Sequence, residues 1–428
     1  MKELKSPSSV AVIGIGRVGL PLALFLADAG HRVFGIDSDE AHIRRLQADR
    51  TLPFVEEGAQ PLLEALLDRR FFPTGELDVV EQCETIIVTI GTPIDEHMNP
   101  ILDPIERVFD KISRHLRRGQ MILLRSTVSP ETTEHLRTYL NEKVNLEVGR
   151  EIHLAFCPER IAQGHSLEEL KDIPQIVGGV TPASTAAAAT FFEALGIATL
   201  PTDAVSAELA KLFCNMYRYI DFAIANEFMI IAGEYKRNIY EIIQLTNTGY
   251  KRGGIKMPGL TGGPCLYKDG FFLIERTPYP ELISNAWKIN ESVPAYLIGR
   301  LESLGDLKGK RVGLMGLAFK KNNDDTRNSL SYKFAKILRR KGAKVIAHDP
   351  YLQADTLEEA LKADILIFAT NHDMYADWGL TGLQERCLPH AWICDPWNIF
   401  ETEQIIFRTD AALTKPAEVF SATSLPAA

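Results

Sequence analysis

The chain has 428 residues, of which 46% are hydrophobic and 24% are charged. This composition is typical of a globular protein and excludes a disordered, fibrous or collagen-like chain, while the length favours about three domains. Acidic side chains outnumber basic ones by 56 to 47. We therefore expect no nucleic-acid partner, because binding along a nucleic-acid backbone needs a cationic face.

Membrane insertion and disulfide chemistry are not expected either. No uninterrupted apolar stretch approaches the roughly 18 residues that a membrane span needs. The apolar run from Val10 is broken by Gly14, Gly16 and Arg17, unlike a signal peptide. The six cysteines are scattered, without a Cys-x-x-Cys pair. The sequence thus predicts no membrane partner, no metal site and a reducing, cytoplasmic location.

Strand-like and helix-like segments alternate along the first part of the chain. Such alternation indicates a parallel sheet with helices on both faces, so we predict an α/β domain over residues 1–200. The apolar runs typical of strands lie at residues 10–15, 32–36, 85–90, 121–125 and 153–156, and the first helical pattern lies at residues 20–29.

The chain changes character after this domain. Between Thr202 and Glu234 there is no proline, and alanine, leucine, methionine and glutamate are frequent. We predict one long helix there, with Thr202 as its N-cap. Helical sequence at residues 240–247 precedes a glycine-rich stretch at residues 249–263. We expect these segments to form a helical middle domain over residues 201–300.

The last part of the chain repeats the pattern of the first. A second doubly wound domain is expected over residues 301–410, followed by a loose tail at residues 411–428. The predicted fold class is therefore α/β, with two doubly wound, Rossmann-like domains joined by a long central helix and a helical middle domain. The runs that indicate the second sheet lie at residues 310–315, 344–347, 365–369 and 392–395, with a helical pattern at residues 331–341.

A glycine-rich loop follows the first predicted strand and opens the first predicted helix. It has the pattern G-x-G-x-x-G, whose glycines allow a tight turn, a close approach to a pyrophosphate and close helix packing. An aspartate about 20 residues further on suits ribose hydroxyls and repels a 2′-phosphate, so we expect NAD rather than NADP. A glycine turn that only packs a helix is the less favoured alternative. The expected cofactor residues are Gly14, Gly16, Arg17, Val18, Gly19 and Asp37.

Cys265 has the most reactive setting among the cysteines. It follows Gly262 and Gly263, which let backbone approach a ligand. We expect it at a helix start, where the helix N-terminus and Lys268 would lower the thiol pKa. Asp269, one turn later, could hold a water or act as a base. A buried structural cysteine in a glycine-rich loop is an equally open alternative.

Other candidates lie on the long helix and at strand ends. Lys211 and Asn215 are four apart and share a helix face, where they could stabilise an oxyanion or form a solvent-facing stripe. Glu159, Thr92 and Thr127 follow predicted strands, at the edge where such sheets bind ligands, although each alone is more often a cap or turn residue.

The second doubly wound domain lacks the third glycine of the first and has Phe319 there, so it need not bind a dinucleotide. Lys320, Lys321 and Arg327 follow as a basic cluster. This cluster suits a phosphorylated ligand, or else is a solvated charged loop.

Taken in order, these motifs resemble the UDP-glucose/GDP-mannose dehydrogenase family from Val10 to about Trp397. The matching motifs are the glycine loop with Asp37, Gly91-Thr92-Pro93, Ser126-Thr127-Val128, Pro158-Glu159-Arg160, residues 207–211 with Asn215, residues 262–265 with Lys268 and Asp269, and residues 316–320 with residues 324–327.

The resemblance implies oxidation of C6 of a nucleotide sugar from alcohol to carboxylate with two NAD. Cys265 would attack the aldehyde to give a thiohemiacetal, a second hydride transfer would give a thioester, and water would hydrolyse it. Lys211 and Asn215 would stabilise the oxyanion. Asp269 would assist water and proton transfers, and Glu159 would act as the base in hydrolysis.

The resemblance also implies binding residues and an assembly. The long helix resembles the family's dimerisation core, so a homodimer is expected, with Arg252 reaching into the partner's site. Thr127 would lie beside the reacting carbon and the nicotinamide. The implied NAD contacts are Thr92, Thr127, Lys268 and Arg327, and the implied UDP-sugar contacts are Glu159, Arg160, Lys211, Asn215, Arg252, Gly259, Gly262 and Lys320.

The chain departs from the family pattern at several positions. His42 stands where many members have Arg or Lys near the adenosine, and Gln163 stands where some have Glu. Pro264, Leu266 and Tyr267 replace a Ser-Cys-Phe-Pro pattern typical of UDP-glucose enzymes. The stretch at residues 249–252 and the run at residues 262–266 resemble the branches of the family that act on UDP-N-acetylhexosamines, notably UDP-N-acetylmannosamine, with UDP-glucose as the alternative substrate.

Two further readings remain open on the residues alone. A two-electron dehydrogenase of the 6-phosphogluconate or 3-hydroxyacid type would share the first domain and the long helix but would not need Cys265 or a second nucleotide fold. A non-enzymatic NAD-sensing protein would keep the fold, but the set that includes Cys265, Lys211 and Asp269 disfavours it.

Overall fold

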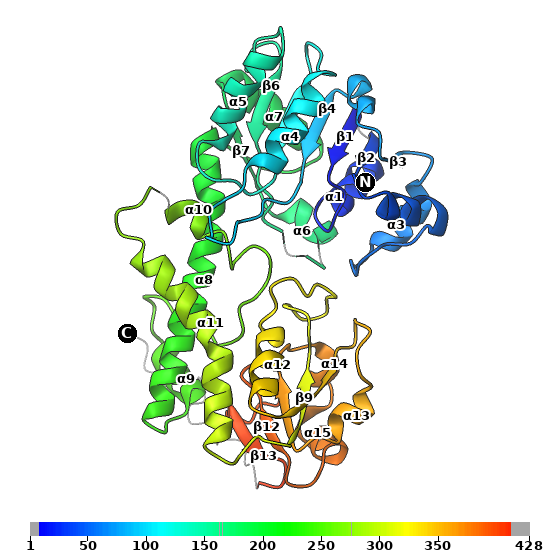
Figure 1. Ribbon diagram of the computed structural model, residues 1–428. Coiled ribbons are helices and arrows are strands. Elements are labelled where there is room, and N and C mark those ends of the chain that lie inside the picture. The colour runs from blue at the N-terminus through cyan, green and yellow to red at the C-terminus, as the bar shows by residue number, and fades with distance from the viewer. Residues whose placement is uncertain (1–7, 162, 165, 275, 412–428) are drawn as a thin grey trace. The chain divides into compact units, whose positions relative to one another are not determined.

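The computed structural model describes residues 8–161, 163–164, 166–274 and 276–411, which form two compact units (Figure 1). The first unit comprises Met1–Met216 and Lys268–Pro278, and the second comprises Tyr217–Tyr267 and the chain from Tyr279 onward. The predicted tail lies, apart from Ala411, outside the described residues. None of the helices described combines the length and apolarity of a membrane-crossing segment.

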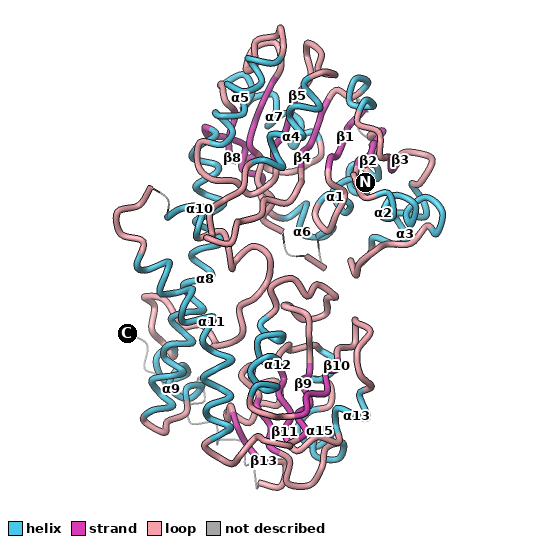
Figure 2. The backbone as a smooth tube through the Cα atoms, viewed as in Figure 1, coloured by secondary structure: helices cyan, strands magenta, loops and turns pink. Residues whose placement is uncertain are grey.

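The first unit is built on an eight-stranded sheet, ordered β3-β2-β1-β4-β5-β6-β7-β8 (Figure 2). The first six of these strands are parallel, as predicted. Strand β7 pairs antiparallel with β6, and β8 pairs parallel with β7. The short β3 and the glycine-containing β7 give weak strand signals, and β8 is largely exposed at the sheet edge. The strands are β1 Ser9–Ile13, β2 Arg32–Ile36, β3 Phe71–Thr74, β4 Thr85–Val88, β5 Met121–Leu124, β6 His153–Phe156, β7 Gln175–Gly179 and β8 Thr199–Asp203.

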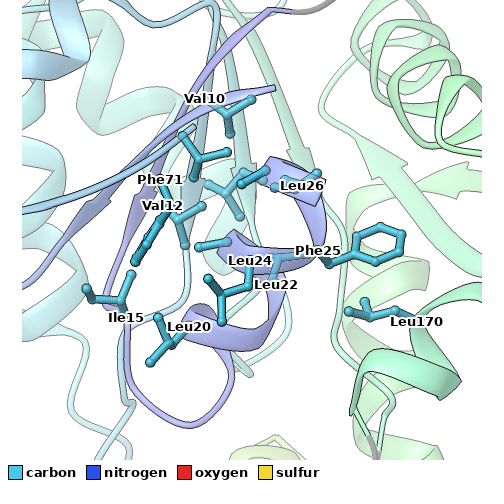
Figure 3. Close-up of a cluster of buried hydrophobic side chains, with 14 of the residues drawn as sticks. Val10, Val12, Ile15, Leu20, Leu22, Leu24, Phe25, Leu26, Phe71 and Leu170 are labelled. Carbon is cyan, nitrogen blue, oxygen red and sulfur yellow. The ribbon is translucent and has the colours of Figure 1, made fainter. Parts of the chain in front are cut away.

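Two hydrophobic cores lie on the two faces of this sheet, and alternate residues of β1 pack into one or the other. Val10 and Val12 pack with α1, and Figure 3 shows this cluster, in which Leu22 and Leu24 lie beside the strand residues. Ala11 and Ile13 instead join the core under α4 and α5. The helices of this unit are α1 Gly19–Asp28, α2 Glu40–Arg44, η1 Arg45–Asp49, α3 Ala59–Leu66, η2 Asp78–Gln82, α4 Asp103–Ser113, α5 Thr132–Lys143, α6 Ser166–Asp172, α7 Pro182–Ala194 and α10 Phe271–Ile274.

The second unit contains a five-stranded sheet, ordered β10-β9-β11-β12-β13, with only β13 antiparallel. Its two faces also carry separate cores, one under α12 and one under α13 to α15. The prediction of two doubly wound, Rossmann-like folds is therefore confirmed. The elements are β9 Arg311–Met315, β10 Lys344–His348, β11 Ile365–Phe368, β12 Trp392–Cys394, β13 Ile406–Arg408, α9 Ile239–Asn247, α11 Glu281–Glu302, α12 Leu330–Arg340, α13 Leu357–Leu361, α14 Asp373–Ala376 and α15 Gly379–Arg386.

The predicted long helix is α8, Ala204–Glu234, whose residues up to Met216 belong to the first unit. Thr202 is not its N-cap, because that residue pairs within β8. Asp203 takes the role instead: its carboxylate accepts hydrogen bonds from the Ser206 amide at 2.8 Å and the Ser206 hydroxyl at 2.6 Å. A carboxylate at this position also interacts favourably with the positive end of the helix dipole.

Candidate functional site

The glycine turn after β1 has the geometry of a phosphate-binding site at a helix N-terminus, which we call a phosphate seat. Gly14 has φ +91°, and a Cβ on Gly19 would lie 2.0 Å from the Gly14 oxygen, so this turn tolerates only glycine at these positions. A Cβ on Gly16 would meet no heavy atom within 4 Å, so the space over the turn is open. The turn therefore fits the pyrophosphate of a dinucleotide at the start of α1.

Two residues of the next segment lie beside this turn. Asp37 follows β2, and its carboxylate accepts a hydrogen bond from the Asp39 amide at 3.0 Å. His42, one of the departures from the family pattern, bonds through Nε2 to the Ile15 oxygen at 2.8 Å. Because that oxygen only accepts, the proton lies on Nε2, and His42 braces the glycine turn.

A polar network joins four of the predicted site residues in the first unit. The Asn215 amide donates to one oxygen of Asp269 at 2.6 Å, and the Lys268 ammonium donates to the other at 3.1 Å. Lys268 also donates to the Thr92 hydroxyl at 3.2 Å. Asp269 is fully buried, so its two oxygens rely on these donors rather than on water for hydrogen bonds.

Lys211 and Glu159 form a second group in the same unit. The buried Lys211 ammonium donates to the main-chain oxygen of Glu159. The Glu159 carboxylate pairs with Arg125, whose side chain is only 1% exposed, and also accepts from the amides of Arg160 and Ile161 at 2.8 and 3.1 Å. Both Glu159 oxygens are thus already engaged.

The sequence reasoning did not single out Arg125. Its guanidinium also donates to the Gln175 side chain at 2.8 Å, so one buried cation ties β5 to the segment with Glu159 and to β7. An arginine at the end of a fully apolar strand is the signal that could have found it, since a buried charge requires a partner.

Glu208 is a second residue that the sequence reasoning passed over, although it lies in the motif that ends at Lys211. Its carboxylate accepts from the amides of Glu131 and Thr133 at 2.7 and 2.8 Å and from the Thr133 hydroxyl at 2.5 Å. It therefore caps α5, the helix that follows the loop with Thr127. Burial raises the pKa of Glu208 to about 7.

Cys265 lies in the second unit and is exposed. The prediction of a helix start at this residue is wrong, because turns extend to Gly270 and the next helix begins only at Phe271. In contrast, burial raises the pKa values of Cys83, Cys157 and Cys387 to about 12 and also raises that of Cys394, which makes these thiols unreactive.

The loop before Cys265 packs closely on the segment that carries Lys320 and Arg327. A Cβ on Gly262 would lie 2.7 Å from the Asn328 oxygen, and one on Gly263 would lie 2.8 Å from the Phe319 ring. These contacts explain why glycines precede the cysteine.

Arg327 adds a charge near the thiol. Its guanidinium bonds both carboxylate oxygens of Asp325, and this pairing, with a smaller contribution from Cys265, raises the pKa of Arg327. Arg252 is not brought into this group: it is exposed, and in the described chain no hydrogen bond or ion pair joins it to these residues.

The predicted site residues are thus distributed over both units. Among the described residues, no cluster of His, Cys, Asp and Glu could hold a metal ion. The first unit holds the glycine turn, Asp37, Thr92, Thr127, Glu159, Arg160, Lys211, Asn215, Lys268 and Asp269, and the second holds Arg252, Gly259, Gly262, Cys265, Lys320 and Arg327.

Comparison with known proteins identifies the class. Residues 8–196 match the NAD binding domain of the UDP-glucose/GDP-mannose dehydrogenase family, residues 205–292 its central domain and residues 313–402 its UDP binding domain. The chain belongs to this family, and it is an NAD-dependent nucleotide-sugar dehydrogenase. Membership of this family excludes the alternatives of a 6-phosphogluconate- or 3-hydroxyacid-type dehydrogenase and of a non-enzymatic NAD-sensing protein.

Particular relatives are similar over nearly the whole chain. The UDP-N-acetyl-D-mannosamine dehydrogenase of Pyrococcus horikoshii is 32% identical over 420 residues, covering 93% of this chain and 97% of that protein. A solved structure of the Pyrococcus enzyme superposes with a TM-score of 0.83 over 89% of this chain and 93% of that one, at 30% identity. The UDP-N-acetyl-mannosamine dehydrogenase structure from Staphylococcus aureus gives 0.83 over 92% and 95%, at 28% identity.

Proposed function

We propose that this enzyme oxidises C6 of a UDP-N-acetylhexosamine, UDP-N-acetylmannosamine foremost, to the carboxylate in two steps. The names of the Pyrococcus and Staphylococcus relatives support this substrate. The observation that carries the two-step chemistry is the exposed Cys265 thiol beside Arg327, on a glycine loop packed against Phe319. Bound NAD supplies a hydride acceptor for each step.

Cys265 is the proposed nucleophile. Its thiolate adds to the C6 aldehyde, the resulting thiohemiacetal loses a hydride to become a thioester, and water cleaves the thioester to release carboxylate and thiol. A thioester keeps the substrate on the enzyme between the two oxidations. UDP-glucose, with a hydroxyl in place of the N-acetyl group, is the alternative substrate.

The first unit supplies the proposed polar groups. Lys211 and Asn215 present cationic and amide donors for a developing oxyanion. Asp269, held by Asn215 and Lys268, is suited to orient water and accept a proton. Glu159 as hydrolytic base requires its carboxylate to leave Arg125, so we propose this role with that condition.

The proposed binding residues are assigned by ligand. Thr127 is the residue proposed to lie beside the reacting carbon. NAD contacts are assigned to Gly14, Gly16, Arg17, Val18, Gly19, Asp37, Thr92, Thr127, Lys268 and Arg327, and UDP-sugar contacts to Glu159, Arg160, Lys211, Asn215, Arg252, Gly259, Gly262 and Lys320.

A homodimer is part of this proposal. In the second unit, α8 exposes an apolar stripe at helical spacing, and Tyr217, Tyr235 and Ile231 are 70%, 75% and 47% exposed. Ile224 and Phe228 continue this stripe. Apolar side chains repeated on one helix face favour burial against another surface, here a second copy of the chain.

The test of the proposed function is the yield of NADH from purified protein with a panel of UDP-hexoses, including UDP-N-acetylmannosamine and UDP-glucose. Two NADH per sugar and a uronate product are expected. One NADH per sugar, or no reaction with any UDP-sugar, would contradict the proposal.

A further inference from the structure

The chain carries the same strand-turn-strand arrangement twice. Gly14 follows β1 and Gly316 follows β9, each with φ +91°, and each donates its amide to the last residue of the second strand at 2.7 Å. An aspartate stands directly after that second strand in both folds, Asp37 after β2 and Asp349 after β10. The two turns are therefore counterparts and can be compared directly.

The aspartates of the two folds do different things. Asp349 Oδ2 accepts hydrogen bonds from the turn amides of Leu317 and Ala318 at 2.7 and 3.0 Å. In the first fold, the only hydrogen bond that Asp37 accepts from a described residue comes from Asp39, and the space over Gly16 is open. The second turn thus has its donors filled from within, while the first leaves them for a ligand.

The backbone after the two turns also differs. Helix α1 begins at Gly19, directly after its turn, whereas α12 begins only at Leu330. Residues 317–329 form a loop in place of the helix N-terminus that would face a pyrophosphate. Lys320 and Arg327 lie in this loop.

We propose that Asp349 is a built-in anion that fills the phosphate seat of the second Rossmann-like fold, closes that fold to a dinucleotide and positions the loop that carries Lys320. A carboxylate can replace a phosphate here because both are anionic acceptors for a pair of backbone amides. Asp349 is 3% exposed, so no ligand shares the seat with it.

His372 contacts the same carboxylate oxygen of Asp349 as the two turn amides do. Its Nε2 lies 3.2 Å from Asp349 Oδ2, and its Nδ1 accepts from the Asn322 amide at 2.9 Å, which places the ring proton on Nε2. Burial, the largest single influence, would raise the pKa of Asp349, but the donors from His372, Ala318 and Leu317 together lower it. Asp349 is therefore the anion that the seat requires.

Asp349 acts on the loop before Cys265 through a series of adjoining contacts. Asp349 holds Ala318, the next residue, Phe319, packs against Gly262 and Gly263, and Cys265 follows two residues later. Asp349 is a positioning residue in this arrangement, because it acts on the reaction through the loop. This part of the inference rests on the proposed function, whereas the filled anion seat does not.

The first experiment measures anion binding without substrate. Asp349→Ala opens the seat, and Asp349→Asn keeps it filled with a group of equal size. With NAD present to occupy the first fold, calorimetric titration with inorganic phosphate is expected to show one additional site in Asp349→Ala, absent from Asp349→Asn and the unmodified enzyme. Equal phosphate binding by all three proteins would overturn the filled seat, whatever the enzyme's substrate.

The second experiment measures UDP-sugar oxidation with and without added formate. Both variants are expected to lose about 10- to 100-fold in kcat/KM, the size of a lost charge-assisted hydrogen bond. Formate should restore part of the activity of Asp349→Ala and none of that of Asp349→Asn, since only the first has room for it. A loss that formate does not relieve, or unchanged kinetics, overturns the positioning role.

If Asp349→Ala does not fold, Asp349→Asn still decides the question. Its side-chain amide has only one acceptor oxygen, so it cannot accept from the Tyr351 amide on one atom and from the turn amides and His372 on the other, as the two carboxylate oxygens do. The KM for UDP-sugar should therefore rise more than kcat falls. An unchanged KM in a folded Asp349→Asn enzyme overturns the proposal.

Discussion

The Asn215 side chain donates a hydrogen bond to Asp269 at 2.6 Å, although the two residues are 54 positions apart. The pair joins the long helix α8 to the segment before α10, within the first unit. This contact joins two of the residues proposed to act on the substrate, and Lys268 anchors the same carboxylate from its other oxygen.

Asn215→Asp is expected to lower kcat by about a hundredfold, the cost of losing an oxyanion donor. Two buried carboxylates face to face cannot both be ionised, so the pair would share a proton and lose its orientation. Asn99→Asp is the matched control, because Asn99 donates to Asp95 at 3.0 Å on the surface, where water screens the charges. Steady-state kinetics at saturating substrates checks this, and equal losses in the two variants would count against the assigned role.

Cys265→Ser is expected to lower turnover by at least about a thousandfold, because a hydroxyl does not replace the thiolate as nucleophile. Cys214→Ser, at the other exposed cysteine, should leave kcat within about twofold. Iodoacetamide labelling followed by peptide mass spectrometry should modify Cys265 long before the four buried thiols. A Cys265→Ser enzyme that still makes two NADH per sugar excludes the thioester route.

Gly16→Ala is expected to weaken NAD binding at least about tenfold with the free energy of unfolding nearly unchanged. The added methyl group meets no protein atom within 4 Å, so only a ligand can oppose it. Gly299→Ala is the control, because its Cβ is equally unopposed, in α11. Calorimetric titration with NAD measures the affinities, and an unchanged affinity in Gly16→Ala would remove the turn from the NAD site.

Glu208 is expected to make stability pH-dependent. Its pKa is raised from 4.5 to about 7 in the folded protein, so the folded state binds this proton more tightly than the unfolded state does. The stabilisation is therefore complete below about pH 4.5 and decreases as pH rises through about 7, by on the order of 3 kcal/mol.

Urea unfolding between pH 5 and pH 8 tests this expectation. The stability advantage of the unmodified protein over Glu208→Gln should shrink as pH rises, because the amide does not titrate. Glu142→Gln, exposed on α5, should give a curve parallel to that of the unmodified protein. Parallel curves for Glu208→Gln as well would show that Glu208 keeps its ordinary pKa.

Ile231→Glu is expected to convert a dimer to monomers, since a charge in the middle of an apolar interface stays desolvated and unpaired. Leu304→Glu is the control, because Leu304 is also 47% exposed but lies outside α8. Light scattering coupled to size-exclusion chromatography gives the masses. A monomer for the unmodified protein, or a dimer for Ile231→Glu, would contradict an interface on this stripe.

Local features of the site could be predicted from the sequence because they depend on neighbouring residues. The turn at Gly14 and Gly16, the aspartate after the second strand and the proline-free α8 all follow from backbone freedom and periodicity over a few residues. The prediction of a helix start at Cys265 is wrong because the residues up to Gly270 form consecutive turns, and such turns leave no periodic signal in the sequence.

The composition and motifs of the sequence by themselves determined an α/β enzyme with two doubly wound domains that binds NAD and has one distinctive cysteine. Only the tertiary structure decided which distant groups meet. It paired Arg125 with Glu159 and placed the Glu208 carboxylate at the N-terminus of α5. It also placed the Asp349 carboxylate on the amides of the second glycine turn, whereas Asp37 bonds the Asp39 amide instead. Such pairings depend on how strands and helices pack in three dimensions. They are selected by the free-energy cost of burying a charge without a partner, and this cost depends on residues that are far apart in the sequence.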